Sequence, residues 1–257
     1  MIRAFFTLLF LLATPVAAQD RLPSYDGVTA LNGVGRLAFS DGGFCTASVV
    51  RDRMVLTAAH CLFRDGTAIA LDDLTFQSGF RNGLAIETRR IVQAVAHPMF
   101  TTGETNRPPE VIAHDIAVLM LDSPVDTLRI RPFQIAAQLL TGETVRVVSY
   151  GEHRAETPLS EEGCLVLGRQ EGVVVLNCDA EFGSSGAPVM RFEQGEWRIA
   201  SVISATAKLN GGRVSLGTSL ESPLRDVLMI LGDMQERDSR SIFVGQRAGS
   251  GAKFVQP

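Results

Sequence analysis

The most constraining feature of this sequence is a series of short apolar runs, each bounded by turn residues. Gly, Asn, Asp and Pro separate the runs along most of the chain. Such runs are typical of antiparallel strands in an all-β sandwich or barrel, because a helix would need a longer apolar stripe with a helical period. We expect strands within residues 33–39, 47–50, 54–59, 74–80, 90–96 and 115–121, and then within 144–150, 164–169, 172–178, 187–192, 197–204 and 214–220.

One helix is predicted near the end of the chain, within residues 222–234. Ser222 is suited to cap it and Pro223 to its first turn, because a proline has no N–H to leave unpaired there. Apolar residues then recur at helical spacing, at Leu224, Val227, Leu228 and Leu231. The predicted fold class is therefore all-β with a C-terminal helix.

The charge balance excludes one large class of function. The chain carries 24 Lys and Arg against 28 Asp and Glu, which gives a net charge of −4. Phosphate backbones are bound by clustered basic side chains, so we expect no nucleic-acid partner. The chemistry suggested by the residues below requires no metal and no organic cofactor, and we predict none.

The first 18 residues have the three parts of an export signal. Arg3 supplies a positive charge, residues 4–13 form a short apolar segment, and residues 16–18 are small enough for a signal peptidase to cleave after Ala18. A retained membrane anchor is the alternative, but the apolar run is too short to span a bilayer of ~30 Å comfortably. We therefore predict a signal peptide at 1–18, no stable membrane anchor after cleavage, and a secreted or periplasmic protein.

Export changes how the four cysteines are interpreted. In an oxidising compartment an even set predicts disulfides, and four cysteines allow three pairings. The local pairings, Cys45 with Cys61 and Cys164 with Cys178, each close a loop of about 15 residues and are worth ~3 kcal/mol each on the chain-entropy model. A zinc site is the alternative, but the sequence has no C-x-x-C pair and no histidine near the second pair. We predict the two local disulfides and no metal.

Three segments together supply what acyl transfer needs. His60 lies in Leu-Thr-Ala-Ala-His-Cys, Asp115 opens the run Asp-Ile-Ala-Val-Leu, and Ser185 lies in Gly-Ser-Ser-Gly-Ala-Pro. Each segment alone also has a structural explanation, as a packed histidine, a turn aspartate or a flexible loop. As a set they provide a nucleophile in Ser185, a base in His60, and an acid in Asp115 that orients the base. The backbone amides of Gly183 and Ser185 are the predicted oxyanion donors.

These segments resemble the chymotrypsin and trypsin superfamily of serine proteases, and the three blocks occur in that family's order. The opening of the chain and the Cys164–Cys178 hairpin are similar to secreted bacterial members of the glutamyl-endopeptidase and trypsin-like type. The resemblance implies two antiparallel six-stranded β-barrels with the catalytic triad in the cleft between them. It also implies the Cys45–Cys61 disulfide. We expect a monomer that acts on protein or peptide substrates.

The two prolines between the strand sets and the composition of the tail suggest how the mature chain is divided. We expect a first barrel with His60 and Asp115, a linker with two prolines, a second barrel and helix with Ser185, and a tail, at residues 19–121, 122–135, 136–235 and 236–257. The tail is polar and rich in glycine. We expect it to be mobile unless its Ser-Ile-Phe-Val segment adds an edge strand.

Substrate choice is predicted from the residue six positions before the serine. In trypsin-like enzymes that position lies at the base of the specificity pocket, and here it is Asp179, which would select Arg or Lys. The alternative is that Asp179 is a hairpin residue beside Cys178 and points elsewhere. Ser204, in the strand end 203–205, is expected on the pocket wall, where it would bind substrate. Glutamyl-specific relatives have a histidine on this wall, and this chain has no histidine after position 153, so glutamate is not the predicted choice.

The sequence departs from animal trypsins beside the nucleophile. Ser184 stands where those enzymes have an aspartate that pairs with a new N-terminal amine, and no Ile-Val-Gly-Gly-like start occurs. Activation through such a salt bridge is therefore not predicted.

Other classes of function fit less well. An α/β-hydrolase esterase needs its histidine after the serine, but all four histidines precede Ser185. A metalloprotease needs a cluster such as H-E-x-x-H, which is missing from the sequence. An inactive protease fold that serves as a binding module is the remaining alternative to a serine endopeptidase, and the reactivity of Ser185 distinguishes the two.

Overall fold

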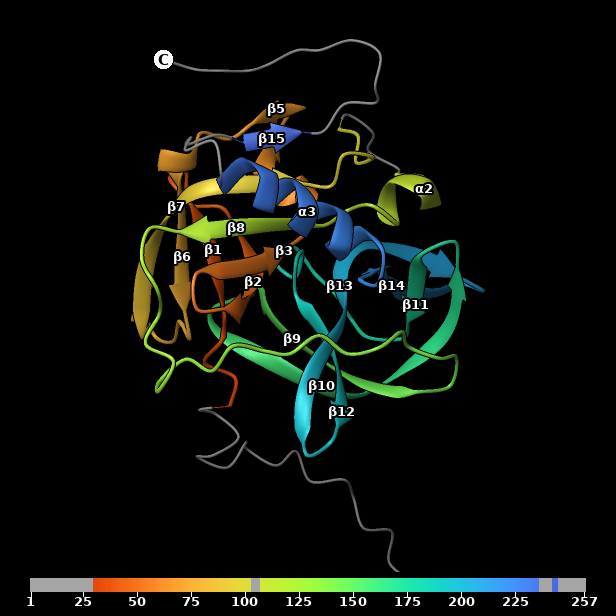
Figure 1. The fold of residues 1–257 in the computed structure, drawn as a ribbon. Coiled ribbons are helices and arrows are strands. Elements are labelled where there is room, and N and C mark those ends of the chain that lie inside the picture. The colour runs from red at the N-terminus through yellow and green to blue at the C-terminus, as the bar shows by residue number, and fades with distance from the viewer. Residues whose placement is uncertain (1–29, 103–106, 236–241, 245–257) are drawn as a thin grey trace, which may run out of the picture.

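The computed structural model describes residues 30–102, 107–235 and 242–244, and within them the strands form two barrels (Figure 1). In the first barrel β7 pairs with both β6 and β8, which closes a ring of six antiparallel strands. Its strands are β1 (Val34–Phe39), β2 (Phe44–Arg51), β3 (Met54–Thr57), β6 (Leu74–Ser78), β7 (Glu87–Ala96) and β8 (Ala117–Leu121).

The second barrel is a closed ring in the order β10-β11-β14-β13-β12-β9, again antiparallel throughout. Its strands are β9 (Thr144–Gly151), β10 (Arg154–Gln170), β11 (Val173–Leu176), β12 (Pro188–Glu193), β13 (Glu196–Leu209) and β14 (Gly212–Ser219). The predicted fold class, all-β with two six-stranded antiparallel barrels and a C-terminal helix, is confirmed.

Short elements complete the described chain and position the site. A 3₁₀ helix, η1 (Ala59–Leu62), follows β3, and a one-turn helix, α2 (Pro109–Ile112), precedes β8. The others are the hairpin β4 (Phe63–Arg64) and β5 (Thr67–Ala68), the 3₁₀ turn η2 (Leu71–Asp73), the helix α3 (Pro223–Gln235) and β15 (Ile242–Val244).

The C-terminal helix covers an apolar outer face of the first barrel. All five residues of β8 are buried, although a barrel strand alternates between inside and outside. Helix α3 contacts β7 and β8 from outside (Figure 1). Its buried side chains are Leu224, Val227 and Leu231, and burying an aliphatic side chain fully is worth ~1.5–3 kcal/mol. The continuous apolar sequence of β8 is thus explained by α3.

The two barrels share packed apolar surface at their contact. Val148 and Tyr150 of β9 and Met190 of β12 belong to the same buried cluster as the interior of the first barrel. The rest of the second barrel has a smaller core of its own. The fully buried Tyr150 also donates its hydroxyl proton to the carbonyl of Phe80, at 2.9 Å. This docking fixes the position of the loops that meet between the barrels.

Several strands differ from their predicted extents, and β3 and β10 show why. The run 54–59 was expected to be all strand, but β3 ends at Thr57, because the chain turns there into η1 and the Cys61 amide bonds to the carbonyl of Ala58. Strand β10 begins at Arg154, well before the predicted run 164–169. Its first half is polar and its pairing with β9 is irregular, so it has no apolar run to reveal it.

Predictions for the two ends fall wholly or partly outside the described residues. The signal peptide at 1–18 lies outside them. Of the tail at 236–257 only β15 is described, and it adds a parallel strand to β7, as the expectation for Ser-Ile-Phe-Val allowed. Across the described ranges we find no helix with the length and apolar character needed to cross a membrane.

Both predicted disulfides are present. Cys45 in β2 is bonded to Cys61 in η1 with an S–S distance of 2.03 Å, and Cys164 in β10 to Cys178 with 2.06 Å. Each of the two groups of side chains close enough to share a metal ion includes such a sulfur pair. Sulfurs in a disulfide have no thiolate to offer a metal.

Candidate active site

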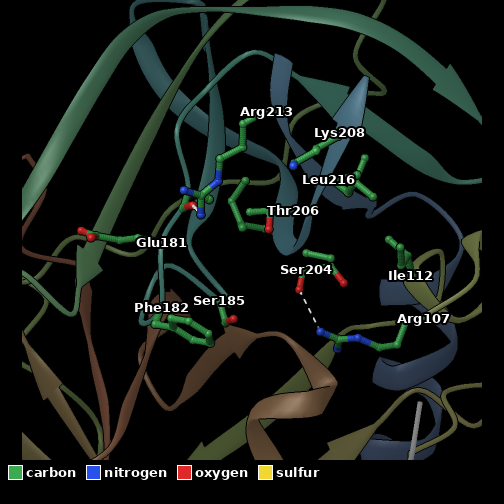
Figure 2. A pocket seen from close by; sticks show the side chains of 14 residues that line it. Arg107, Ile112, Glu181, Phe182, Ser185, Ser204, Thr206, Lys208, Arg213 and Leu216 are labelled. Atoms are coloured by element: carbon green, nitrogen blue, oxygen red, sulfur yellow. Dashed lines mark hydrogen bonds between the residues drawn. The ribbon is translucent and has the colours of Figure 1, made fainter. Parts of the chain in front are cut away.

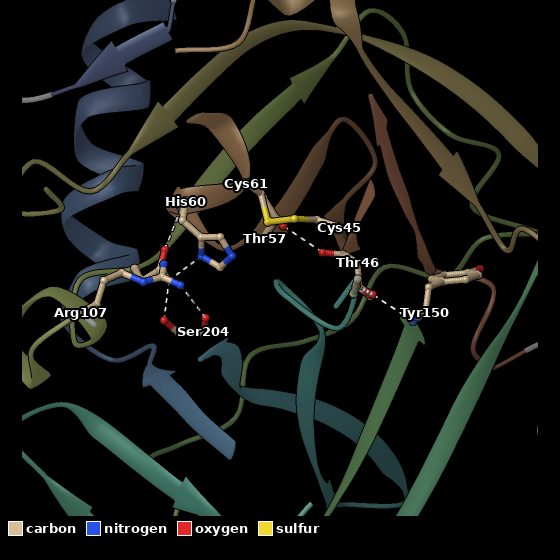
Figure 3. Close-up of a disulfide and its surroundings, with 10 residues drawn as sticks. Cys45, Thr46, Thr57, His60, Cys61, Arg107, Tyr150 and Ser204 are labelled. Carbon is tan, nitrogen blue, oxygen red and sulfur yellow. Dashed lines mark hydrogen bonds and ion pairs between the residues drawn. A yellow bond between two sulfur atoms is a disulfide. The ribbon is translucent and has the colours of Figure 1, made fainter. Parts of the chain in front are cut away.

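His60 is held between a strand end and a disulfide. It lies in η1 directly after β3, and its neighbours Ala59 and Cys61 are buried. The Cys61–Cys45 bond ties this turn to β2 (Figure 3). The imidazole side chain itself is 23% exposed. The ring is therefore accessible although its backbone is fixed.

Asp115 precedes β8, is fully buried, and is hydrogen-bonded twice to His60. Its Oδ1 accepts the backbone N–H of His60 at 2.8 Å, and its Oδ2 lies 2.7 Å from the imidazole Nδ1. Because a carboxylate only accepts, the proton of the neutral ring is assigned to Nδ1. This tautomer leaves a lone pair on Nε2, which is what a general base requires.

Two further donors reach the same carboxylate. Arg107 Nη1 donates to Asp115 Oδ2 at 2.9 Å, and the Ser204 hydroxyl donates to the same oxygen. Arg107 Nη2 also donates to the carbonyl of Ser204 at 3.2 Å (Figure 3). Burial raises the pKa of Asp115, but the neighbouring His60, Arg107 and Ser204 outweigh it and hold the pKa below its ordinary value. Asp115 is therefore an anion.

The loop that carries Ser185 is fixed by a residue of the other barrel. Thr46 in β2 donates its backbone N–H to the carbonyl of Ser185 at 2.8 Å, and its hydroxyl to the carbonyl of Gly183 at 2.8 Å. The Thr46 hydroxyl also accepts the amide of Tyr150 at 3.0 Å (Figure 3). One threonine thus joins the serine loop, β9 and β2.

Two glycines are required by this close approach. Gly183 has φ +93° and Gly186 has φ +80°, in the left-handed region that L side chains rarely adopt. A Cβ on Gly186 would lie 2.1 Å from Thr57 Oγ1 and 3.1 Å from the Ala58 amide nitrogen. The loop of Ser185 therefore packs directly against the turn that leads into His60.

The two backbone amides predicted to bind the oxyanion are free to donate a hydrogen bond in the described chain. Among the described residues, the amides of Gly183 and Ser185 have no hydrogen-bond acceptor. Within the same ranges the Ser185 hydroxyl forms no hydrogen bond either, to His60 or to any other residue. Contacts of this kind often tighten only when a substrate is bound.

Ser184 is fully buried, and its amide and hydroxyl both form hydrogen bonds with neighbouring residues. Its amide donates to the carbonyl of Glu181 at 3.0 Å, and its hydroxyl lies 3.3 Å from the Glu181 amide and 3.3 Å from the Tyr150 carbonyl. A neutral hydroxyl that is satisfied locally needs no cationic partner. The loop geometry around Ser185 thus forms without a salt bridge at position 184.

A cavity of about 550 Å³ opens beside Ser185, between the serine loop and the strands β13 and β14 (Figure 2). Its wall includes the predicted strand end, Ile203, Ser204 and Ala205. Charged residues also line it. They are Arg107, Glu181, Lys208 and Arg213.

The prediction that Asp179 lies at the base of this cavity is wrong in position. Asp179 is not among the lining residues, and its side chain is 79% exposed. Its amide donates to the carboxylate of Glu161 at 3.2 Å, and the preceding Cys178 is held by the disulfide. The hairpin alternative describes its position correctly, and Arg213 faces the cavity instead. The predicted preference for Arg or Lys was based on Asp179, and it therefore has no support from the lining of the cavity.

Ser204 lines the cavity as predicted, but its hydroxyl is not available to a substrate. That hydroxyl is bonded to Asp115, and the residue is 2% exposed. The polar group that remains to Ser204 on the cavity wall is its backbone carbonyl, which accepts a hydrogen bond from Arg107.

Two residues of the site were missed from the sequence, Arg107 and Thr46. Arg107 lies eight positions before Asp115 in a segment without an apolar period. Thr46 lies 137 positions before Gly183, and its role depends on the docking of the barrels. Neither position carries a local pattern that could have revealed it.

Two antiparallel six-stranded barrels, one with a buried Asp–His pair and the other with a glycine-flanked serine, define the class of two-barrel serine proteases. The sequence agrees with the fold, since the family model described as Trypsin matches residues 32–213. The chain therefore belongs to the trypsin family and has its serine protease fold. The narrower bacterial glutamyl-endopeptidase type stays a prediction.

Proposed function

We propose that the protein is a serine endopeptidase that hydrolyses peptide bonds with Ser185, His60 and Asp115. The observation that carries the proposal is the bond from Nδ1 of His60 to the buried Asp115 carboxylate. That bond leaves Nε2 as the basic atom of the ring, next to a loop with a serine and two amides that have no other acceptor in the described chain.

The reaction follows from these positions. Ser185 Oγ attacks the scissile carbonyl carbon while His60 Nε2 takes the hydroxyl proton. The carbonyl oxygen becomes an oxyanion, which the amides of Gly183 and Ser185 bind. As the C–N bond breaks, the imidazolium returns its proton to the leaving amine and an acyl-enzyme remains. Water, deprotonated by the same Nε2, then attacks the acyl carbon, and as the ester bond breaks the imidazolium returns the proton to Ser185 Oγ and the acid leaves.

Asp115 acts through His60 in both steps. Its negative charge stabilises the imidazolium, and its two bonds to His60 fix the direction of the ring. Arg107 and Ser204 hold the carboxylate in place from its other side. No step requires a cofactor.

Export and substrate class complete the proposal. Two disulfides and a trypsin-family domain fit an extracellular or periplasmic protein, and the pattern at residues 1–18 supports export. The cavity beside Ser185 would hold the side chain before the scissile bond. We propose protein or peptide substrates and a monomeric enzyme.

Labelling with a sulfonyl fluoride tests the proposal against an inactive binding module. An activated Ser185 Oγ displaces fluoride and forms a stable sulfonyl ester, which mass spectrometry of the tryptic peptides detects. We expect labelling of Ser185 in the wild-type protein, none in Ser185→Ala, and cleavage of a casein substrate by the wild type alone. A wild-type protein that is folded but neither labelled nor active on casein would be a binding module.

A further inference from the structure

The cavity beside Ser185 has a cationic wall. Arg213 on β14 and Lys208 on β13 both line it, and in Figure 2 both side chains extend toward the space in front of Thr206. Within the described residues, Lys208 has no carboxylate within ion-pair distance. A side chain that enters the cavity therefore meets two positive charges.

The carboxylates near the cavity are occupied or face away from it. Glu181 forms an ion pair with Arg154 at 2.9 Å, and in Figure 2 it points away from Arg213. Asp179 lies outside the lining, with its Oδ1 3.7 Å from Arg213 Nη1. An ion pair this loose between exposed groups contributes little, so it leaves most of the positive field of Arg213 in place.

Arg213 is held so that it faces the cavity. Its Nη2 donates to the carbonyl of Ala180 at 2.6 Å, from the loop that leads to Ser185. Its partners thus come from one side, and its side chain is still 55% exposed. The third cation of the lining, Arg107, is already bonded to Asp115 and to the Ser204 carbonyl.

We propose that this cavity selects an acidic side chain, glutamate or aspartate, immediately before the scissile bond, and that Arg213 is the main specificity residue with Lys208 as its partner. The inference rests on the proposed peptidase function. A guanidinium binds a carboxylate through charge-assisted and often bidentate hydrogen bonds. A lysine or arginine side chain would instead be repelled by Arg213 and would have to reach past it to Asp179. The wall thus contains both an attractive and a repulsive element.

A set of matched peptides tests the proposal. The peptides differ only in the residue before the scissile bond, which is Glu, Gln, Leu or Lys, and kcat/KM is measured for each with the full mature protein. We expect Glu to exceed Gln by about tenfold or more and Lys to be the poorest, since a charge-assisted bond is worth that ratio. Arg213→Gln should remove most of the preference for Glu over Gln, and Lys208→Gln should reduce it by a smaller factor.

A control variant separates the local charge from the net charge. Arg198→Gln removes the same charge from β13, where Arg198 bonds Glu196 and Gln194 outside the cavity lining, and it should keep the wild-type preference. Thermal melts should agree among the variants, because each replaced side chain is partly or largely exposed.

The outcomes also separate this inference from the proposed function. Failure of a sulfonyl fluoride to label Ser185, together with no cleavage of any peptide, removes the peptidase itself. Normal labelling with equal cleavage after Glu and Gln, with faster cleavage after Lys, or with no cleavage after Glu overturns the acidic preference alone. A preference for Glu that survives Arg213→Gln overturns the assignment to Arg213.

Discussion

In the first barrel, His60 and Asp115 are joined to each other and fixed by buried neighbours, whereas in the second barrel Ser185 is partly exposed and the cations Lys208 and Arg213 of the cavity wall are exposed. Asp115 is fully buried with four donors, and His60 is anchored next to a disulfide. The Ser185 hydroxyl has no partner in the described chain, and the cavity cations Lys208 and Arg213 reach solvent.

Under the proposed function, this difference separates the residues of proton transfer from those of substrate selection. A base and its orienting acid must keep one geometry through every turnover, so burial and several hydrogen bonds suit them. Groups that recognise a substrate must exchange water for ligand, so exposure suits them. Changes around His60 and Asp115 should therefore lower reactivity toward all substrates, and changes at the cavity wall of the second barrel should alter the ranking among substrates.

The largest effect is expected from Asp115→Asn. The amide can still accept the His60 backbone N–H, but its NH₂ group cannot accept from Nδ1, so the wrong tautomer is favoured. We expect kcat/KM to fall by about 10⁴-fold, the size typical of this change in a triad. The ranking of peptides by their residue before the scissile bond should not change. A loss of less than about tenfold would mean that Asp115 does not orient the base.

Removing the two disulfides one at a time compares the barrels directly. Cys45→Ala with Cys61→Ala and Cys164→Ala with Cys178→Ala open loops of similar length, with sequence separations of 16 and 14. Each pair should lower the free energy of unfolding by ~3 kcal/mol on the chain-entropy model. Only the first pair releases the turn of His60, so only it should slow sulfonylation of Ser185 at a temperature where both variants are folded. Equal rates in the two variants would contradict the division of roles.

Thr46→Val tests the link between the barrels. Valine has nearly the same shape, but the Gly183 carbonyl and the Tyr150 amide each lose a buried partner. We expect about 2 kcal/mol less stability in urea unfolding, and a loss of activity toward every peptide alike. Thr102→Val, at an exposed threonine with a 3.4 Å contact to Gly66, serves as the control and should leave both unchanged. A changed substrate ranking in Thr46→Val would place the effect in the cavity instead.

The smallest effect is expected from Arg107→Gln. The pKa of Asp115 is held below its ordinary value, so this carboxylate stabilises the fold above the pKa of the unfolded state, and that stability is lost as pH falls through the native pKa. Without Arg107 the native pKa rises, so acid unfolding should begin at a higher pH. At neutral pH we expect about 1.5 kcal/mol less stability, the size of one charge-assisted bond. Unchanged acid unfolding, followed by circular dichroism, would show that His60 and Ser204 suffice.

The sequence predicts those parts of this molecule that depend on local pattern. Strands, the C-terminal helix and the two disulfides follow from apolar runs, capping residues and short loops, and the structure confirms them. The blocks of His60, Asp115 and Ser185 are visible because glycine and cysteine neighbours mark them. The roles of those three residues remain predictions.

The errors have one physical cause, which is contact between distant segments. Asp179 was assigned from its offset to Ser185, but Arg213, on a different strand, is what faces the cavity. Arg107 and Thr46 act only after the loops and barrels have docked. The polar half of β10 was not predicted, because it is a strand through its pairing with β9 and not through burial of apolar side chains. Pairwise contacts of this kind leave no trace in a single sequence.

The bond between Thr46 and the serine loop has a consequence for biosynthesis. The ribosome makes β2 early and the loop of Ser185 late, and the loop receives its orientation only when the finished second half of the chain folds against the first. A complete chain whose second half has not yet folded against the first, or a second half released by a nick in the connecting segment, would contain Ser185 but would lack the contact with Thr46 that orients its loop. If the proposed function is correct, docking of the two barrels is itself the event that makes the protein active, and a chain that has not finished folding would not cleave its neighbours.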